Sequence, residues 1–320
     1  MHMTYILFII GFVLLIKGAD MLVDGSVSLA KRYGISAIVI GLTIVAFGTS
    51  TPELAVNIMS AIRGSTDIAI GNILGSNIAN IFLILGVSAI VAPLTVHRNT
   101  IAKEIPFSLL AALVVGFLAL DSFFDIRATS VLSRGDGFVL LGFFAIFMYY
   151  IFGIAKDAPQ DVPESEQPQH LSKKKSYLFI FGGLVLLVVG GKWIVDGAIA
   201  LAQLVGMNES VIGLTVVAVG TSLPELATSV IAARKGQSDI AIGNVVGSNI
   251  FNIFWILGVS AIIAPLPFSL TEISNIVMTG VASILLFAAL FVGKKHTLQR
   301  WQGVVFVCIY VGYVVLLLTT

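Results

Sequence analysis

Ten stretches of the sequence are apolar over about 20 residues or more, long enough for each to cross the hydrocarbon core of a bilayer as a helix. Of the 320 residues, 58% are hydrophobic and only 11% are charged, whereas a soluble domain has about 25% charged residues. The sequence therefore predicts an all-α integral membrane protein with ten transmembrane helices. The predicted spans cover residues 4–30, 35–62, 67–93, 100–121, 133–156, 174–204, 207–233, 238–264, 270–293 and 299–319.

The basic residues predict the orientation of these spans. Loops between spans carry an excess of Lys and Arg on the cytoplasmic side of a membrane. If the N-terminus lies outside, 13 of the 18 basic residues fall on the cytoplasmic side, and only Arg63, Arg127 and Arg134 fall outside. The bias predicts extracellular N- and C-termini. We also expect a prokaryotic plasma membrane, because no large central loop is present.

The two halves of the chain are copies of each other. Residues 41–93 align without a gap on residues 213–265, with 36 identities in 53 positions. The match extends back more weakly, from LVDG at 22–25 to IVDG at 194–197. An internal repeat of this quality shows that the second half duplicates the architecture of the first.

The repeats are predicted to be inverted. Each holds five spans, an odd number, so the second copy enters the membrane from the opposite side. Arg63 accordingly falls outside, whereas its counterpart Lys235 falls inside. Inverted repeats of this kind are common in secondary transporters, whose substrate sites lie at the interface of the repeats. We expect a first half over residues 1–156, a polar, Pro-rich cytoplasmic linker over 157–173, and a second half over 174–320.

Within the second span, the stretch GLTIVAFGTSTPELAVN (residues 41–57) combines hydroxyls, a proline and a glutamate. Pro52 has no N–H, so the carbonyl of Gly48 loses its helical partner, and Gly48 itself loosens the turn. The pattern predicts a broken helix with free carbonyls near Ala46 to Gly48. GLTVVAVGTSLPELATS (residues 213–229) repeats the arrangement in the seventh span.

Oxygen donors gather around each break. Ala46, Thr49, Ser50 and Glu53 are spaced so that they share one helical face. Ala218, Thr221, Ser222 and Glu225 repeat the spacing. Hard oxygen donors suit Ca²⁺, Na⁺ or Mg²⁺, and no His or Cys lies near to indicate zinc or iron.

The third and eighth spans add polar stripes. Asn72, Ser76 and Asn80 recur every four residues, as do Asn244, Ser248 and Asn252. Gly71, Gly75, Gly243 and Gly247 lie beside these stripes and are expected to allow close helix approach. Four oxygen-bearing helices can therefore meet at one site, although such residues also simply join helices, and for Asn72 and Asn244 both interpretations stay open.

Two buried carboxylates decide what the site binds. Burial of a charge in a membrane is costly, so Glu53 and Glu225 are expected to be functional. A site of charge −2 is neutralised by one Ca²⁺, by two or more Na⁺, or by two protons. These ions exclude one another, and mutual exclusion at a site open alternately to each side is the basis of exchange.

GTSTPE and GTSLPE, followed by GNILGSNIANIF and GNVVGSNIFNIF, resemble the paired alpha repeats of the cation/Ca²⁺ antiporter superfamily, within it the prokaryotic Na⁺/Ca²⁺ exchangers, including the K⁺-dependent-exchanger-like branch. The resemblance implies Na⁺/Ca²⁺ antiport by alternating access, with the first and sixth helices sliding past the other eight. It assigns Ca²⁺ to Glu53 and Glu225 with the carbonyls of Thr49 and Thr221. It assigns Na⁺ to Ala46, Ser50, Glu53 and Ser76, and to Ala218, Ser222, Glu225 and Ser248.

The resemblance places Asn80 and Asn252 at the positions that complete the central site. Some relatives carry Asp there in one repeat, so the ion stoichiometry and any coupling to H⁺ or K⁺ stay open. The expected partners are Ca²⁺, Na⁺ and the lipid bilayer. No nucleic acid, no obligatory protein partner and no cofactor beyond the transported ions is expected.

Three alternatives use the same residues. A Ca²⁺ or other divalent cation/H⁺ antiporter would trade protons at the same glutamates. A passive cation channel fits inverted repeats with broken helices less well. An intramembrane enzyme with Ser50 or Ser222 as nucleophile lacks a nearby base, since the four histidines fall at the terminus or in loops.

Several charged residues outside the motifs have open roles. Asp24 and Asp196, matched by the repeat, could attract cations or take part in gating, but an Asp near the interface is more often simply solvated. Lys17 and Lys192 lie within spans and could pair with the glutamates. Asp67 and Asp239 open the third and eighth spans, where a carboxylate complements a helix N-terminus.

Overall fold

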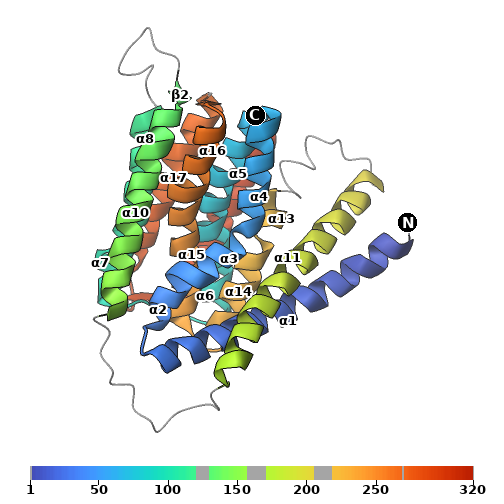
Figure 1. Ribbon diagram of the computed structural model, residues 1–320, viewed down its shortest axis with the longest axis vertical. Helices are drawn as coiled ribbons and strands as arrows, with labels where there is room; N and C mark the ends of the chain where they lie inside the picture. The colour runs from blue at the N-terminus through green and yellow to red at the C-terminus, as the bar shows by residue number, and fades with distance from the viewer. Residues whose placement is uncertain (1, 120–129, 157–170, 205–217, 269, 320) are drawn as a thin grey trace.

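The computed structural model describes residues 2–119, 130–156, 171–204, 218–268 and 270–319. Helices follow one another along the chain and form a bundle (Figure 1). In the first half they are α1 (His2–Tyr33), α2 (Ala37–Ile40), η1 (Gly41–Val45), α3 (Ala46–Thr49), α4 (Thr51–Arg63), α5 (Thr66–Ala79), η2 (Asn80–Leu85), α6 (Gly86–Val91), α7 (Arg98–Ala102), α8 (Glu104–Ala119) and α10 (Arg134–Lys156). In the second half they are α11 (Lys173–Leu204), α13 (Ala218–Thr221), α14 (Leu223–Arg234), α15 (Ser238–Ile250), η5 (Phe251–Leu257), α16 (Gly258–Ile263), α17 (Leu270–Ala289) and α18 (Arg300–Thr319).

These helices confirm the all-α membrane fold. Within the described ranges, 8 helices are long and apolar enough to cross a membrane, and the pair Ala37–Thr49 and Thr51–Arg63, bent by 47°, adds a ninth. The predicted seventh span begins within residues 205–217, which lie outside the described ranges, and continues as α13 and α14. Most of the predicted linker, residues 157–170, also lies outside them.

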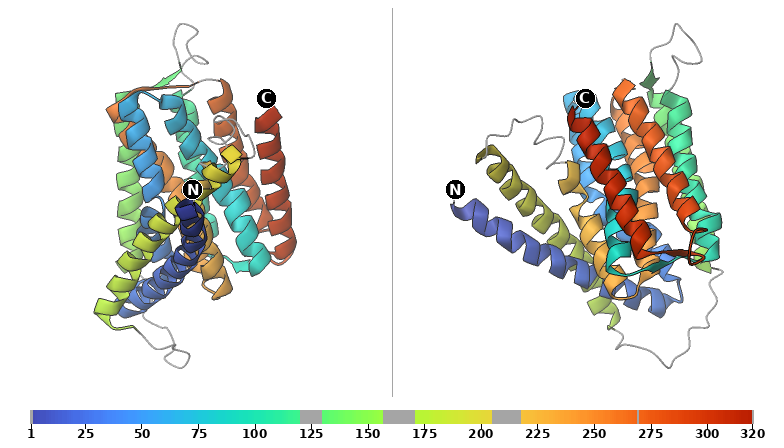
Figure 2. Two further views of the ribbon diagram at one scale, coloured as in Figure 1. Left: turned by 90° about the vertical axis from the view of Figure 1, so that its right-hand side faces the viewer. Right: turned by 180° about the vertical axis from the view of Figure 1, so that it is seen from behind.

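Two short antiparallel ladders reflect the inverted repeat. β1 (Leu94–Thr95) pairs with β4 (Thr297–Leu298), and β2 (Val131–Leu132) pairs with β3 (Leu266–Pro267). β1 and β3 occupy matching positions of the two repeats, yet the ladders lie at opposite ends of the bundle (Figures 1 and 2). Equivalent loops therefore face opposite sides of the membrane.

The spans of the repeated motif form the centre of the bundle. In the spans Thr66–Val91 and Ser238–Ile263, 78% of the apolar window is buried inside the protein, against 17% in α10 and in α18. Three of the segments are wound as π-helices, namely η1, η2 and η5. A π-helical turn inside an α-helix is rare and is frequent at functional sites. The centre of the bundle is therefore both the best packed and the least regular part of the fold.

α1 and α11 form a separate antiparallel pair that crosses the bundle obliquely. Their backbones approach through glycines: a Cβ added at Gly11 would lie 2.9 Å from the carbonyl oxygen of Gly190, and one at Gly18 would lie 2.7 Å from that of Gly183. Figure 2 shows the two helices side by side, lying against the bundle near the C-terminal end of α1 and leaning away from it towards the N-terminus. The pair is thus packed tightly within itself and asymmetrically on the rest of the protein.

Candidate cation site

Glu53 and Glu225 lie in the first turns of α4 and α14, directly after the breaks in the second and seventh spans. Each break is followed by a proline at the start of the new helix, where the missing N–H costs no helical hydrogen bond. Both carboxyl groups are buried, with 1% of each residue exposed. Within the described ranges neither glutamate forms an ion pair with a basic side chain.

Hydroxyl groups from both repeats surround the carboxylate of Glu225. The hydroxyl of Ser50 lies 3.0 Å from Oε1 of Glu225, and the hydroxyl of Ser248 lies 3.5 Å from the same oxygen. The two hydroxyls are also 3.0 Å apart. The second and eighth spans, each from a different half of the chain, therefore meet at this carboxylate.

The carboxylate of Glu53 has the matching environment. Its Oε1 lies 3.5 Å from the hydroxyl of Ser76 and 3.4 Å from the hydroxyl of Ser222, which is itself 3.2 Å from Ser76. Each glutamate thus contacts a serine hydroxyl of its own repeat and a serine hydroxyl of the other. This exchange of partners ties both halves of the chain into a single site.

Four buried oxygens at the site make no hydrogen bond within the described residues. They are Oε2 of Glu53, Oε2 of Glu225, Oδ1 of Asn80 and Oδ1 of Asn252. An acceptor left unpaired in a buried position costs about 1–3 kcal/mol, and more when it is charged. Buried oxygen acceptors without a protein donor are suited to bind a cation.

Asn77 and Asn249 hold the two site asparagines in this orientation, although they were not singled out in the sequence. The amide nitrogen of Asn80 donates to Oδ1 of Asn249 at 2.9 Å, and that of Asn252 donates to Oδ1 of Asn77 at 2.9 Å. Asn77 in turn donates to the carbonyl of Asn249 at 3.1 Å. Because the nitrogens are occupied, the unpaired oxygens of Asn80 and Asn252 are left for a ligand.

Thr49 and Thr221 each donate a hydrogen bond across the repeats. The hydroxyl of Thr49 donates to Oδ1 of Asn244 at 2.9 Å, and that of Thr221 donates to Oδ1 of Asn72 at 3.3 Å. The amide nitrogens of the same asparagines donate to neighbouring side chains, Asn72 to Asn57 at 2.7 Å and Asn244 to Ser229 at 2.9 Å. In this structure Asn72 and Asn244 therefore join helices, which is one of the two interpretations that the sequence leaves open.

The prediction that the Ala46 carbonyl is free of hydrogen bonds is wrong. The backbone N–H of Ser50 donates to this carbonyl at 3.0 Å, and the hydroxyl of Thr49 lies 3.3 Å from it. Pro52 removes the N–H that would bond Gly48 four residues earlier, whereas Ser50 keeps its own N–H and still bonds Ala46. The matching residue, Ala218, is the first residue of α13.

The glycines beside the asparagine stripe are confirmed as sites of close approach in the second repeat. A Cβ at Gly243 would lie 2.9 Å from the carbonyl oxygen of Ile38, and one at Gly247 would lie 2.8 Å from that of Leu42. Gly71 and Gly75 meet nothing within 4 Å in the described structure. The repeat matches Ile38 and Leu42 with residues 210 and 214, which lie outside the described ranges.

The lysines within spans do not neutralise the glutamates here. Lys192 pairs with Asp196 on the same helix at 2.6 Å, and Lys17 is exposed. Among the described residues, no cationic side chain contacts the two carboxylates, the four serine hydroxyls or the two amide oxygens of the candidate site.

The predicted position of two aspartates at helix starts is confirmed, since Asp67 and Asp239 lie in the first turns of α5 and α15.

A helical membrane protein whose inverted halves jointly surround two buried carboxylates with hydroxyl and amide oxygens has the architecture of a secondary cation transporter. The sequence matches the sodium/calcium exchanger protein family over residues 3–153 and 175–319. The chain belongs to this family, so it is a cation antiporter of the sodium/calcium exchanger type and not an enzyme.

Similar proteins cover the whole chain. The putative antiporter CaxA of Alkalimonas amylolytica is 39% identical over 327 residues, covering 100% of both chains. The sodium/calcium exchanger MaX1 of Methanosarcina acetivorans is 35% identical over 346 residues, covering 98% of each chain. The sodium-calcium exchanger NCX_Mj, in a structure soaked with 2.5 mM Na⁺ and 0.1 mM Ca²⁺, is 34% identical with a TM-score of 0.81, covering 97% of this chain and 96% of that one.

Proposed function

We propose that this chain exchanges Na⁺ for Ca²⁺ across the membrane by alternating access, at one site near the membrane midplane built on Glu53 and Glu225. The observation that carries the proposal is the set of four unpaired oxygens on Glu53, Glu225, Asn80 and Asn252. Two carboxylates and two amide oxygens form a hard-oxygen site of charge −2, which suits one Ca²⁺. The relatives named as sodium/calcium exchangers support the same pair of ions.

We propose that Na⁺ occupies the same region at different oxygens. The serine hydroxyls at 50, 76, 222 and 248 lie next to the two glutamates and can coordinate Na⁺ together with the carboxylates and the carbonyl at 218. The carbonyls of Thr49 and Thr221 are assigned to Ca²⁺. Since both ions need the same two carboxylates, bound Na⁺ and bound Ca²⁺ exclude each other. This exclusion couples the two fluxes.

The proposed setting is a prokaryotic plasma membrane with both termini outside and a cytoplasmic linker over residues 157–173 joining the halves. The distribution of Lys and Arg supports this orientation, since Lys235 and the basic segment at 173–175 then face the cytoplasm. A relative named inner membrane protein YrbG, from Escherichia coli, is 38% identical over 266 residues, covering 81% of this chain and 79% of YrbG.

The proposal is tested with purified protein in liposomes loaded with Na⁺ and diluted into Na⁺-free medium containing ⁴⁵Ca²⁺. We expect Ca²⁺ uptake that depends on internal Na⁺ and is absent from liposomes loaded with choline. Uptake driven instead by an outward proton gradient would assign the chain to Ca²⁺/H⁺ antiport. Uptake that follows the Ca²⁺ gradient without either counter-ion would contradict antiport.

The amide oxygens of the site give a graded prediction. Replacing Asn80 or Asn252 by Ala removes one neutral ligand and leaves both carboxylates, so we expect the apparent Ca²⁺ affinity to fall about tenfold, or ~1.4 kcal/mol. The matched control is Asn99→Ala, because Asn99 is exposed near the start of α7. Initial rates of ⁴⁵Ca²⁺ uptake over a range of Ca²⁺ concentrations measure the effect. Unchanged affinity in both site variants would remove the asparagines from the ligand set.

A further inference from the structure

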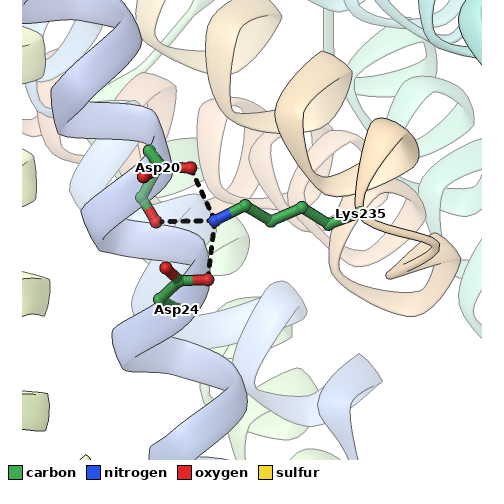
Figure 3. Close-up of polar contacts among 3 residues, drawn as sticks. All are labelled: Asp20, Asp24 and Lys235. Atoms are coloured by element: carbon green, nitrogen blue, oxygen red, sulfur yellow. Dashed lines mark hydrogen bonds and ion pairs between the residues drawn. The ribbon is translucent and has the colours of Figure 1, made fainter. Parts of the chain in front are cut away.

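Three charged side chains join α1 to the end of α14. The ammonium group of Lys235 lies 2.6 Å from Oδ1 of Asp20 and 2.6 Å from Oδ1 of Asp24, and it also contacts the carbonyl of Asp20 at 3.3 Å (Figure 3). Asp20 and Asp24 are one turn apart on α1, so both carboxylates face the same lysine. We call these three residues the first ion cluster. It connects the α1 and α11 pair to the rest of the bundle.

The internal repeat predicts a second cluster of different composition. The alignment that relates the two halves matches Lys235 with Arg63, and Asp24 with Asp196. It matches Asp20, however, with Lys192, so one carboxylate of the first cluster is a base in the second half. We call Arg63, Asp196 and Lys192 the second ion cluster. Asp196 can form an ion pair with Arg63, but Lys192 competes for the same carboxylate.

The second ion cluster is not assembled in this structure. Asp196 pairs with Lys192 at 2.6 Å, and both side chains are exposed, by 47% and 70%. Arg63 is exposed at the end of α4, and within the described ranges it forms no ion pair. The lysine of the first ion cluster is more enclosed, with 29% of its side chain exposed. One cluster is therefore closed while its counterpart is open.

The packing of α1 and α11 shows the same asymmetry. Within the pair the contacts obey the repeat, since Gly11 faces Gly190 and Gly18 faces Gly183. The contacts between the pair and the bundle do not obey the repeat. A Cβ at Gly220 would meet Val195 of α11, whereas a Cβ at the equivalent Gly48 would meet Leu184, also of α11. Symmetric seating would bring Val23 of α1, the counterpart of Val195, to Gly48. For a symmetric pair packed asymmetrically on a pseudo-symmetric bundle, we expect a second seat of similar geometry, related to the first by the pseudo-two-fold axis of the inverted repeats.

We propose that the first and second ion clusters are alternative latches, that is, two sets of ion pairs of which only one forms at a time. Each latch holds the α1 and α11 pair in one of two seats, meaning one of two positions against the bundle. This proposal rests on the alternating access proposed above. With the first cluster closed, as here, the pair lies against the bundle at the end that carries Lys235 and leans away at the other end. Movement to the second seat breaks the contacts of Lys235 and brings Asp196 to Arg63.

The composition of the clusters gives this equilibrium a direction. Lys235 has two carboxylates within reach, whereas Arg63 must displace Lys192 to gain one. Partly exposed ion pairs contribute little each, so the bias is small enough for ion binding to overcome. The first seat is therefore favoured in the absence of ions. The charges at positions 20 and 192 determine the size of this preference.

Distances between spin labels at Met59 on α4 and Leu201 on α11 test the latches. Both residues are exposed and belong to neither cluster, and the exposed Cys308 is first replaced by Ser. In protein with both clusters unsubstituted, we expect two distances between the labels. The longer distance belongs to the first seat and predominates, and the shorter distance belongs to the second seat. Lys235→Gln should raise the ratio of short to long roughly threefold to tenfold. Lys235→Arg should leave the ratio unchanged.

The second cluster supplies variants that act in known directions without touching the first. Lys192→Gln frees Asp196 and should also raise the ratio, whereas Arg63→Gln should lower it. Both side chains are exposed, so these variants are expected to fold even if Lys235→Gln does not. An unchanged ratio in Lys192→Gln, or a rise in Arg63→Gln, would overturn the latches. ⁴⁵Ca²⁺ uptake by the parent protein, measured separately, reports on the proposed function alone, so failure of the latches and failure of antiport are distinguishable.

Discussion

Replacing Glu53 or Glu225 by Gln is expected to lower Na⁺-driven Ca²⁺ uptake at least about 100-fold, which corresponds to ~2.7 kcal/mol. Each substitution keeps the shape of the side chain and removes one of the two negative charges of the site. Removing one partner of a buried pair of opposite charges costs about 3–5 kcal/mol, since the other charge stays uncompensated. Because both ions are proposed to use the same carboxylates, Na⁺-dependent and Ca²⁺-dependent fluxes should fall together.

Glu104 provides the matched control for these substitutions. It is buried like the site glutamates, with 2% of the residue exposed, but it lies on α8 and accepts a hydrogen bond from the hydroxyl of Tyr150. Glu104→Gln should therefore retain most of the uptake seen in unsubstituted protein. Initial rates in liposomes, normalised to the amount of reconstituted protein, compare the three variants. Uptake that survives both Glu53→Gln and Glu225→Gln would remove the glutamates from the transport site.

Much of the fold follows from the sequence because the bilayer limits the possible structures. Apolar stretches of sufficient length must be helices, and the gapless repeat with five spans per half requires inversion. Helix ends are also encoded locally: α4 ends at Arg63 and is followed by Gly64 with a φ of 75°, and α14 ends at Arg234 and is followed two residues later by Gly236 with a φ of 71°. What the sequence does not reveal is how α1 and α11 pack on the bundle. An internal repeat predicts equivalent contacts for the two helices, whereas a Cβ at Gly220 would meet Val195 and one at Gly48 would meet Leu184, both on α11.

The site was predictable in its ligand types but not in its connections. Glu53 and Glu225 are conspicuous because a carboxylate is costly within a membrane span. Asn77 and Asn249 were missed because they fall one residue after the serines of the stripe, on a different face of the helix. The repeat was the available signal, since both asparagines are identical between the halves. The π-helical winding of η2 and η5 has no comparable signal in residue type, and it begins within the site, since Asn80 lies in η2 and Asn252 lies in η5.

The close approach of helices at Gly247 gives the last prediction. Replacing Gly247 by Ala is expected to destabilise the protein by about 1–3 kcal/mol and to lower Na⁺-driven Ca²⁺ uptake at least about 30-fold. A Cβ at this position would lie 2.8 Å from the carbonyl oxygen and 2.9 Å from the Cα of Leu42, so the backbone of the second span must move. Gly247 directly precedes Ser248 in the eighth span. The hydroxyl of Ser248 lies 3.0 Å from that of Ser50, which lies in the second span together with Leu42. Displacement of the span therefore separates the hydroxyls that meet at Glu225.

Gly142→Ala is the control, because Gly142 is exposed on α10 and a Cβ there meets nothing within 4 Å in the described structure. Ala is favoured over Gly in a helix by about 1 kcal/mol, so this variant should be as stable as the parent or more so. Thermal unfolding in detergent and ⁴⁵Ca²⁺ uptake in liposomes measure the two effects. If Gly247→Ala matched Gly142→Ala in both, the spacing of these helices would not set the geometry of the site. A loss of uptake with little loss of stability would show that the site tolerates less displacement than the fold does, as expected when ligands from opposite halves of the chain must meet at a single ion.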